Sequence, residues 1–124
     1  PKLTTHLEID PKNGIHCTTG SLGHGLPIGT GMAIARKIQA KPGKIYVMIS
    51  DGECQEGTTW ESLLIGATHK LDNLVVIIDY NKIQSLDWVK NTLDLEPLSD
   101  KLKAFGFSVH EINGHNHREI CQGY

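Results

Sequence analysis

Oxygen-bearing residues at two places in the chain, about thirty residues apart, could together hold a divalent cation. Asp51 and Gly52 directly follow an apolar run, and Asn81 follows a second apolar run, with Ile83 just beyond it. A carboxylate, an amide oxygen and a main-chain carbonyl are ligands that Mg²⁺ accepts when phosphate oxygens and water fill its remaining positions. A glycine also lets the backbone approach a phosphate closely. The residues from Ser50 to Ile83 therefore predict a site for Mg²⁺ and a diphosphate.

Each half of this pattern also has an ordinary interpretation. Ser50, Asp51 and Gly52 after a strand most often form a turn, and Asp79 to Asn81 is a common turn sequence as well. Either tripeptide alone would be weak support for a site. Their joint occurrence after two neighbouring apolar runs is more specific, and it favours the metal site over two unrelated turns.

The elements that position these residues follow from the hydrophobic pattern. The runs at 44–49 and 73–78 are short, apolar and rich in β-branched residues, which predicts two buried strands. Strands that alternate with helices predict an α/β fold, with a parallel sheet and helices on both of its faces. In such sheets ligands bind beyond the carboxyl ends of the strands, which is where Asp51 and Asn81 lie. The other expected elements are helices at 22–39, 55–70 and 98–105 and a third strand at 107–112.

Size, charge and cysteine content narrow the class of protein. A length of 124 residues predicts one domain over 1–124, and we expect it to be incomplete at one or both ends because it begins with Pro1. The formal net charge of -2 and the absence of a long apolar stretch give no reason to expect nucleic acid or a membrane as a partner. Three cysteines, odd in number and widely spaced, suit a reducing compartment, so we expect a cytoplasmic protein.

Two segments resemble the motifs of one enzyme family. The stretch from Ser50 to Ile83, which begins Ser-Asp-Gly and ends Asp-Tyr-Asn-Lys-Ile, is similar to the thiamine diphosphate motif of transketolases, where Gly is usual in place of Ser50. The stretch from Thr18 to Gly25 resembles their Thr-Gly-Ser/Pro-Leu-Gly-Gln-Gly segment, with His24 in place of Gln. The resemblance extends over about residues 6–120 and implies the thiamine diphosphate-binding fold.

The resemblance also implies roles for individual residues. Asp51, Asn81 and the main-chain carbonyl of Ile83 would bind Mg²⁺. His6 falls where transketolases carry a histidine that touches substrate hydroxyls, so it is the predicted catalytic residue. The segment 20–22 would line the rings of the cofactor. The predicted cofactor-binding residues are Gly20, Ser21, Leu22, Gly52, Glu53 and Asn81.

The function that the resemblance implies is transfer of a two-carbon ketol unit from a ketose phosphate to an aldose phosphate, with thiamine diphosphate and Mg²⁺ as cofactors. In the family a pyrimidine-binding domain or subunit supplies the glutamate that activates the cofactor. We therefore expect a homodimer or heterotetramer when the enzyme is complete, and no activity from this chain alone. Two alternatives stay open: a non-catalytic thiamine diphosphate-binding or scaffold domain, and part of a related thiamine enzyme such as a deoxyxylulose phosphate synthase.

Overall fold

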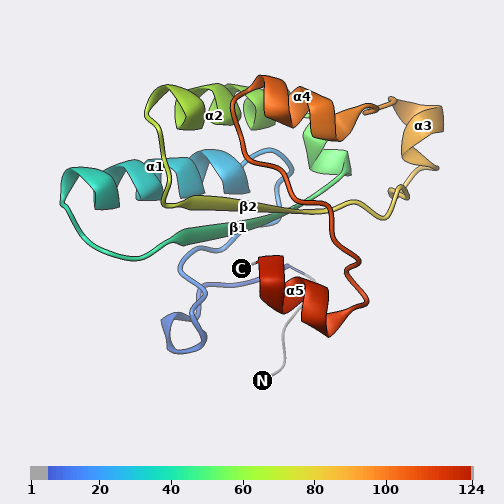
Figure 1. The fold of residues 1–124 in the computed structure, drawn as a ribbon. Coiled ribbons are helices and arrows are strands. Elements are labelled where there is room, and N and C mark those ends of the chain that lie inside the picture. Colours follow the sequence, from blue (N-terminus) through green and yellow to red (C-terminus); the bar gives the residue numbers. More distant parts are fainter. Residues whose placement is uncertain (1–5, 124) are drawn as a thin grey trace.

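The computed structural model describes residues 6–123, so residues 1–5 and 124 of the expected domain lie outside the described part. No helix within that part is long and apolar enough to cross a membrane. The α-helices, 3-10 helices (η) and strands are, in chain order, η1 (Pro11–Asn13), α1 (Gly25–Ile38), β1 (Ile45–Ser50), η2 (Gly52–Gln55), α2 (Gly57–Thr68), β2 (Leu74–Asp79), α3 (Val89–Thr92), α4 (Leu98–Ala104) and α5 (His117–Gly123) (Figure 1).

The sheet consists of two parallel strands whose ends are level. β1 and β2 pair in register from Ile45 opposite Leu74 to Ser50 opposite Asp79. The backbone N–H of Asp51 donates to the Asp79 carbonyl over 3.2 Å, one step beyond the last strand pair. Helix α2 forms the connection that returns the chain to the start of the neighbouring parallel strand. The carboxyl ends of the two predicted strands therefore lie side by side, as the hydrophobic pattern predicted.

Helices lie on both sides of this sheet. Figure 1 shows α1, α2 and α4 on one side of the strands and α5 on the other. Because side chains alternate along a strand, Val47 and Ile49 are buried on one face of β1, while Tyr46 and Met48 point to the opposite face and are at least half exposed. The parallel pairing and the helices on both sides confirm the predicted α/β fold.

Helix α1 packs closely on β1 because the residues at the contact are small. A Cβ atom at Gly29 would collide with the Val47 side chain, and Ala33 is fully buried. Leu26, in the first turn of α1, is 1% exposed and belongs to the same core. Close packing of helix on strand is therefore one reason for the glycines in this part of the chain.

The prediction of a third strand at 107–112 is wrong. Within the described residues this segment forms no strand, because the sheet contains β1 and β2 alone. Phe107 and Val109 are partly buried while Ser108 and His110 are exposed. Burial therefore alternates along this segment, as the sequence pattern suggested, although no strand forms. A strand also needs a neighbouring strand to pair with its N–H and C=O groups, and alternation does not reveal whether one is there.

The helices are shorter than the sequence pattern predicted. The helix expected at 22–39 begins at Gly25, because Gly23 has a left-handed φ of +75° that an α-helix does not accommodate. The helix expected at 55–70 becomes α-helical at Gly57, after the 3-10 turn η2. The residues just after β1 therefore lie in a tight turn between strand and helix.

Candidate functional site

Asp51 lies at the point where β1 ends and η2 begins. The residue is 2% exposed, and each oxygen of its carboxylate accepts a backbone hydrogen bond. Oδ1 accepts from the Gly52 N–H over 2.8 Å, and Oδ2 accepts from the Lys82 N–H over 2.8 Å. Since a carboxylate has roughly four acceptor positions, both oxygens keep a lone pair for a cation. Asp51 therefore joins the loop after β2 to the end of β1.

The loop after β2 folds tightly around Asn81. The Asn81 Oδ1 accepts from the Ile83 N–H over 2.9 Å, which makes a side-chain turn. Between these residues, Lys82 has a left-handed φ of +68°, which costs a residue with a side chain about 1–2 kcal/mol. The Lys82 carbonyl accepts from the Val89 N–H over 3.0 Å. Asn81 and Ile83 thus flank the residue that contacts Asp51, so the three predicted metal ligands gather at one edge of the sheet.

Glu53 connects the second predicted segment to this edge. Its Oε1 accepts from the Gly23 N–H over 3.2 Å, and its Oε2 accepts from the Ser50 N–H over 3.1 Å. The Thr58 hydroxyl donates to the Gly23 carbonyl over 2.7 Å. Gly23 also requires glycine, because its φ is left-handed and a Cβ would clash with the Thr58 and Glu56 side chains. Glu53, a predicted cofactor-binding residue, therefore holds the protein's own backbone together here.

The residues predicted to line the cofactor directly precede Gly23. Gly20, Ser21 and Leu22 are all exposed. His6 lies against this segment, because a Cβ at Gly20 would be 2.7 Å from the His6 ring. The structure therefore brings the predicted catalytic histidine next to the predicted cofactor-lining residues. The roles assigned to them stay predictions.

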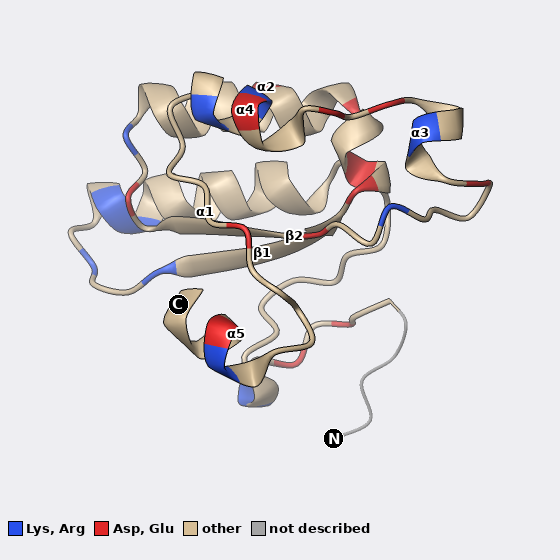
Figure 2. Ribbon diagram, turned by 45° about the vertical axis from the view of Figure 1, so that its right-hand side comes forward, with Lys and Arg blue, Asp and Glu red and all other residues tan. Residues whose placement is uncertain are grey.

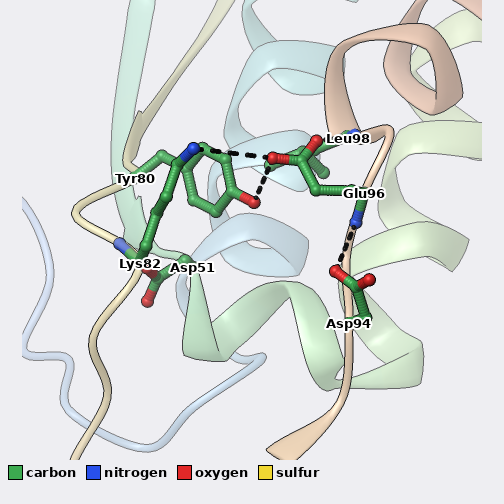
Figure 3. Close-up of polar contacts among 6 residues, drawn as sticks. All are labelled: Asp51, Tyr80, Lys82, Asp94, Glu96 and Leu98. Atoms are coloured by element: carbon green, nitrogen blue, oxygen red, sulfur yellow. Dashed lines mark hydrogen bonds and ion pairs between the residues drawn. The ribbon is translucent and has the colours of Figure 1, made fainter. Parts of the chain in front are cut away.

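Tyr80 and Lys82 meet a carboxylate for which the sequence carries no signal. The Tyr80 hydroxyl donates to Glu96 Oε1 over 2.9 Å, and the Lys82 ammonium lies 3.8 Å from the same oxygen (Figure 3). Lys82 Nζ also lies 5.3 Å from the centre of the Tyr80 ring. Burial, together with the hydrogen bond to Glu96, raises the pKa of Tyr80 to about 12. The same hydrogen bond lowers the pKa of Glu96, so a neutral donor faces a charged acceptor at neutral pH.

The charges at this edge of the sheet suit a cation. Asp51 and Glu53 follow β1, and Asp79 ends β2. The basic last turn of α1 lies at the opposite end of the sheet, where β1 begins (Figure 2). Lys82, which lies at the same edge as the acids, is already paired with Glu96. Because several carboxylates would repel a bare diphosphate, a divalent cation would favour the binding of such a ligand here.

Two further features beside Asp51 suit a phosphate ligand. A Cβ at Gly52 would be 3.4 Å from its nearest neighbour, the Oε1 at the flexible end of Gln84. The fold therefore does not demand glycine at this position, whereas a closely approaching phosphate would. The Gln84 Nε2 is buried without a hydrogen-bond partner among the described residues, and a phosphate oxygen would give this donor an acceptor. The residues present thus fit a metal-bound diphosphate.

The described chain contains no cluster of the side chains that most often hold a metal by themselves. Within residues 6–123, no group of three or more His, Cys, Asp or Glu side chains could hold a metal. A hollow between the segment 109–112 and α5 contains none of the predicted site residues in its lining. The strand ends at Asp51 are therefore the candidate site, because donors from two separate parts of the chain converge there.

Fold and site together define an α/β domain with a candidate metal–diphosphate site at the carboxyl ends of two parallel strands. Over residues 1–123 the chain matches the family described as transketolase, thiamine diphosphate binding domain. The chain belongs to this family, which confirms the resemblance that the two motif segments suggested.

Curated relatives agree with this assignment. The chain is 44% identical over 119 residues to an apulose-4-phosphate transketolase subunit of Actinobacillus succinogenes, a match that covers 96% of this chain and 43% of that protein. It is 42% identical over 118 residues to the 6-deoxy-6-sulfo-D-fructose transketolase subunit SqwG of a Clostridium species, covering 95% and 43% respectively. Transketolase of Homo sapiens is 35% identical over 107 residues, a match that covers 86% of this chain and 17% of that protein. The chain thus spans less than half the length of these relatives.

Solved structures share the fold. Transketolase from Campylobacter jejuni superposes with a TM-score of 0.83 at 32% identity, over 90% of this chain and 19% of that one. Transketolase from Leishmania mexicana superposes with a TM-score of 0.81 at 28% identity, over 86% and 18% respectively. The fold of this chain is therefore that of one part of these transketolases.

Proposed function

We propose that this chain forms the part of a transketolase that binds Mg²⁺ and thiamine diphosphate. Asp51, Asn81 and the Ile83 carbonyl hold the cation in this proposal, and Gly52 allows the diphosphate to approach. The observation that carries the proposal is the hydrogen bond from the Lys82 N–H to the buried Asp51 carboxylate. It brings the loop that contains the other two oxygen donors to the end of β1.

The remaining site residues serve the rest of the cofactor and the substrate. Gly20, Ser21 and Leu22 line the cofactor rings in this proposal, a role supported by their exposure and by the tie between Gly23 and Glu53. His6 lies beside Gly20, and in this proposal its side chain contacts the substrate hydroxyls. Bound thiamine diphosphate supplies a nucleophilic carbon and an electron sink, while the chain's own residues bind and orient it.

The proposed reaction transfers a two-carbon ketol unit from a ketose phosphate to an aldose phosphate. Two relatives bear the names of transketolase subunits, and the chain spans 43% of each. A pyrimidine-binding domain or subunit therefore completes the site in this proposal, within a homodimer or a heterotetramer. Exposed apolar side chains such as Leu22, Leu64 and Ile65 support a protein partner. Ketol transfer by the purified chain alone would contradict this division of the active site.

Titration calorimetry with thiamine diphosphate, in the presence and absence of Mg²⁺, tests the proposal. We expect the wild type to bind the cofactor in a Mg²⁺-dependent manner and Asp51→Ala to lose that binding. Asp72→Ala is the control, because it removes an exposed carboxylate near the amino-terminal end of β2. Thermal melting must accompany the titration, since Asp51→Ala leaves the Gly52 and Lys82 N–H groups without their acceptor. Equal binding by the wild type and by folded Asp51→Ala would show that the site assignment is wrong.

A further inference from the structure

Glu96 is held in one position by its own neighbours along the chain. Its Oε2 accepts from the Leu98 N–H over 3.2 Å, and its N–H donates to Asp94 Oδ1 over 3.1 Å (Figure 3). The Lys101 ammonium donates to the Glu96 carbonyl over 3.1 Å. The side chain and the backbone of Glu96 are therefore both fixed independently of the loop after β2.

The second carboxylate oxygen of Glu96 meets both neighbours of Asn81. The Tyr80 hydroxyl lies 2.9 Å from Oε1 and donates to it, and Lys82 Nζ lies 3.8 Å from it. Figure 3 shows the Tyr80 and Lys82 side chains extending from the loop toward this one carboxylate. The loop is therefore anchored, on each side of Asn81, to a single point outside the loop.

The backbone conformation of Lys82 depends on contacts that hold it, and the contact with Glu96 adds to the two backbone hydrogen bonds with Asp51 and Val89. A left-handed φ is unfavourable for a residue with a side chain, and it persists only where the surroundings hold it. In this conformation the Lys82 N–H donates to Asp51 Oδ2. If the loop relaxed to a common conformation, the peptide groups on both sides of Lys82 would turn. Asn81 and the Ile83 carbonyl would then lose the orientation that the hydrogen bond between the Lys82 N–H and Asp51 gives them.

We infer that Glu96 is a positioning residue for the metal site: by holding Tyr80 and Lys82, it fixes the loop that presents Asn81 and the Ile83 carbonyl to the cation. This inference rests on the proposed function. Glu96 acts through its two partners, so it needs no contact with the cation or the cofactor.

The expected effect on metal binding is moderate. Loss of groups that orient metal ligands typically weakens metal affinity about 10–100-fold. Glu96 is exposed, and water screens its ion pair with Lys82. We therefore expect the lower limit of that range, about 10-fold, when Glu96 is removed.

The test is a titration with Mn²⁺, a paramagnetic substitute for Mg²⁺, in the presence of excess thiamine diphosphate. Electron paramagnetic resonance measures Mn²⁺ binding to the purified protein, after subtraction of a titration without protein. Glu96→Ala and Lys82→Met should each weaken Mn²⁺ binding about 10-fold. Lys82→Arg keeps a cation for Glu96 and should bind nearly as tightly as the wild type. Asp72→Ala is the matched control, because the Lys37–Asp72 pair has the same 3.8 Å separation as the Lys82–Glu96 pair.

Melting without metal separates positioning from a general loss of stability. The inference predicts weaker Mn²⁺ binding in Glu96→Ala even where the metal-free melting temperature is unchanged. It also predicts that Lys82→Arg, unlike Lys82→Met, keeps nearly wild-type binding. Tyr80→Phe removes only the hydroxyl that donates to Glu96, so it tests the same contact if Glu96→Ala fails to fold. It should also weaken Mn²⁺ binding.

Three outcomes would overturn the inference. If folded Glu96→Ala and Tyr80→Phe bind Mn²⁺ with wild-type affinity, Glu96 does not position the metal-binding loop. The proposed function would still stand if Asp51→Ala alone lost Mn²⁺ binding. Lys82→Met and Lys82→Arg could lose Mn²⁺ affinity equally, with parallel losses of melting temperature. Glu96 would then stabilise the protein without positioning the metal site. If the wild type itself fails to bind Mn²⁺ with thiamine diphosphate, the proposed function fails and the inference fails with it.

Discussion

The carboxylate of Asp51 and the backbone N–H of Lys82 form a 2.8 Å hydrogen bond between the ends of two parallel strands. The two residues are 31 positions apart in the chain, and the register of β1 with β2 brings them together. This hydrogen bond fixes the position of the loop with Asn81 relative to the buried carboxylate before any ligand binds. A preorganised site loses less conformational entropy when a ligand binds, and in this way the contact favours ligand binding.

Glu53→Gln should lower the free energy of unfolding by about 1–3 kcal/mol. The Gly23 and Ser50 N–H groups donate to different oxygens of Glu53, and in Gln an NH2 donor replaces one of these oxygens and leaves one part-buried N–H unpaired. Denaturant unfolding without metal or cofactor measures this effect. Glu61→Gln is the control: Glu61 is exposed on α2, and its change should stay within about 0.5 kcal/mol. Equal stability of the two variants would show that the tie between Glu53 and Gly23 contributes nothing.

Two glycines of α1 should respond to alanine with opposite signs. Gly29→Ala places a Cβ against the Val47 side chain and should destabilise the protein by about 1–3 kcal/mol. Gly31→Ala meets no atom within 4 Å among the described residues, and it should stabilise the helix by about 0.5–1 kcal/mol because alanine favours helices. Denaturant unfolding of both variants measures the difference. Changes of the same sign would contradict the close packing of α1 on β1.

Cys54 should resist alkylation although it lies beside the candidate site. Burial, followed by the nearby charges of Asp51 and Glu53, raises the pKa of its thiol to about 12. At about pH 8 only about one thiol in ten thousand would then be a thiolate, and the reactive fraction grows only as the pH rises toward 12. Cys121 is exposed and should react first. Mass spectrometry of the alkylated peptides measures both rates, and equal rates at pH 8 would contradict the buried position of Cys54.

The strands and the residues at their ends could be predicted because each depends on a local pattern. Two short β-branched runs indicate buried parallel strands, and parallel strands place Asp51 and Asn81 at one edge of the sheet. The segment 107–112 shows the limit of this reasoning, because alternation reports burial and not the presence of a neighbouring strand.

The contacts that hold the site together could not be predicted in the same way. Lys82 contributes a backbone N–H, which almost every residue type has, and its left-handed φ depends on contacts distant in the chain. Glu96 reaches Tyr80 from 16 positions away, through a loop whose path no local pattern determines. Glu53 has the residue type of a ligand, but its carboxylate accepts hydrogen bonds from the protein's own backbone at Gly23 and Ser50.

The proposed metal site is tested most directly by a crystal of the protein grown with Mn²⁺ and thiamine diphosphate, in which anomalous scattering locates the metal. We predict one strong peak about 2 Å from an Asp51 carboxylate oxygen, Asn81 Oδ1 and the Ile83 carbonyl oxygen, the coordination distance typical of Mg²⁺. Bound cofactor whose metal lies away from these three oxygens, or a metal peak at another part of the chain, would contradict the proposed site.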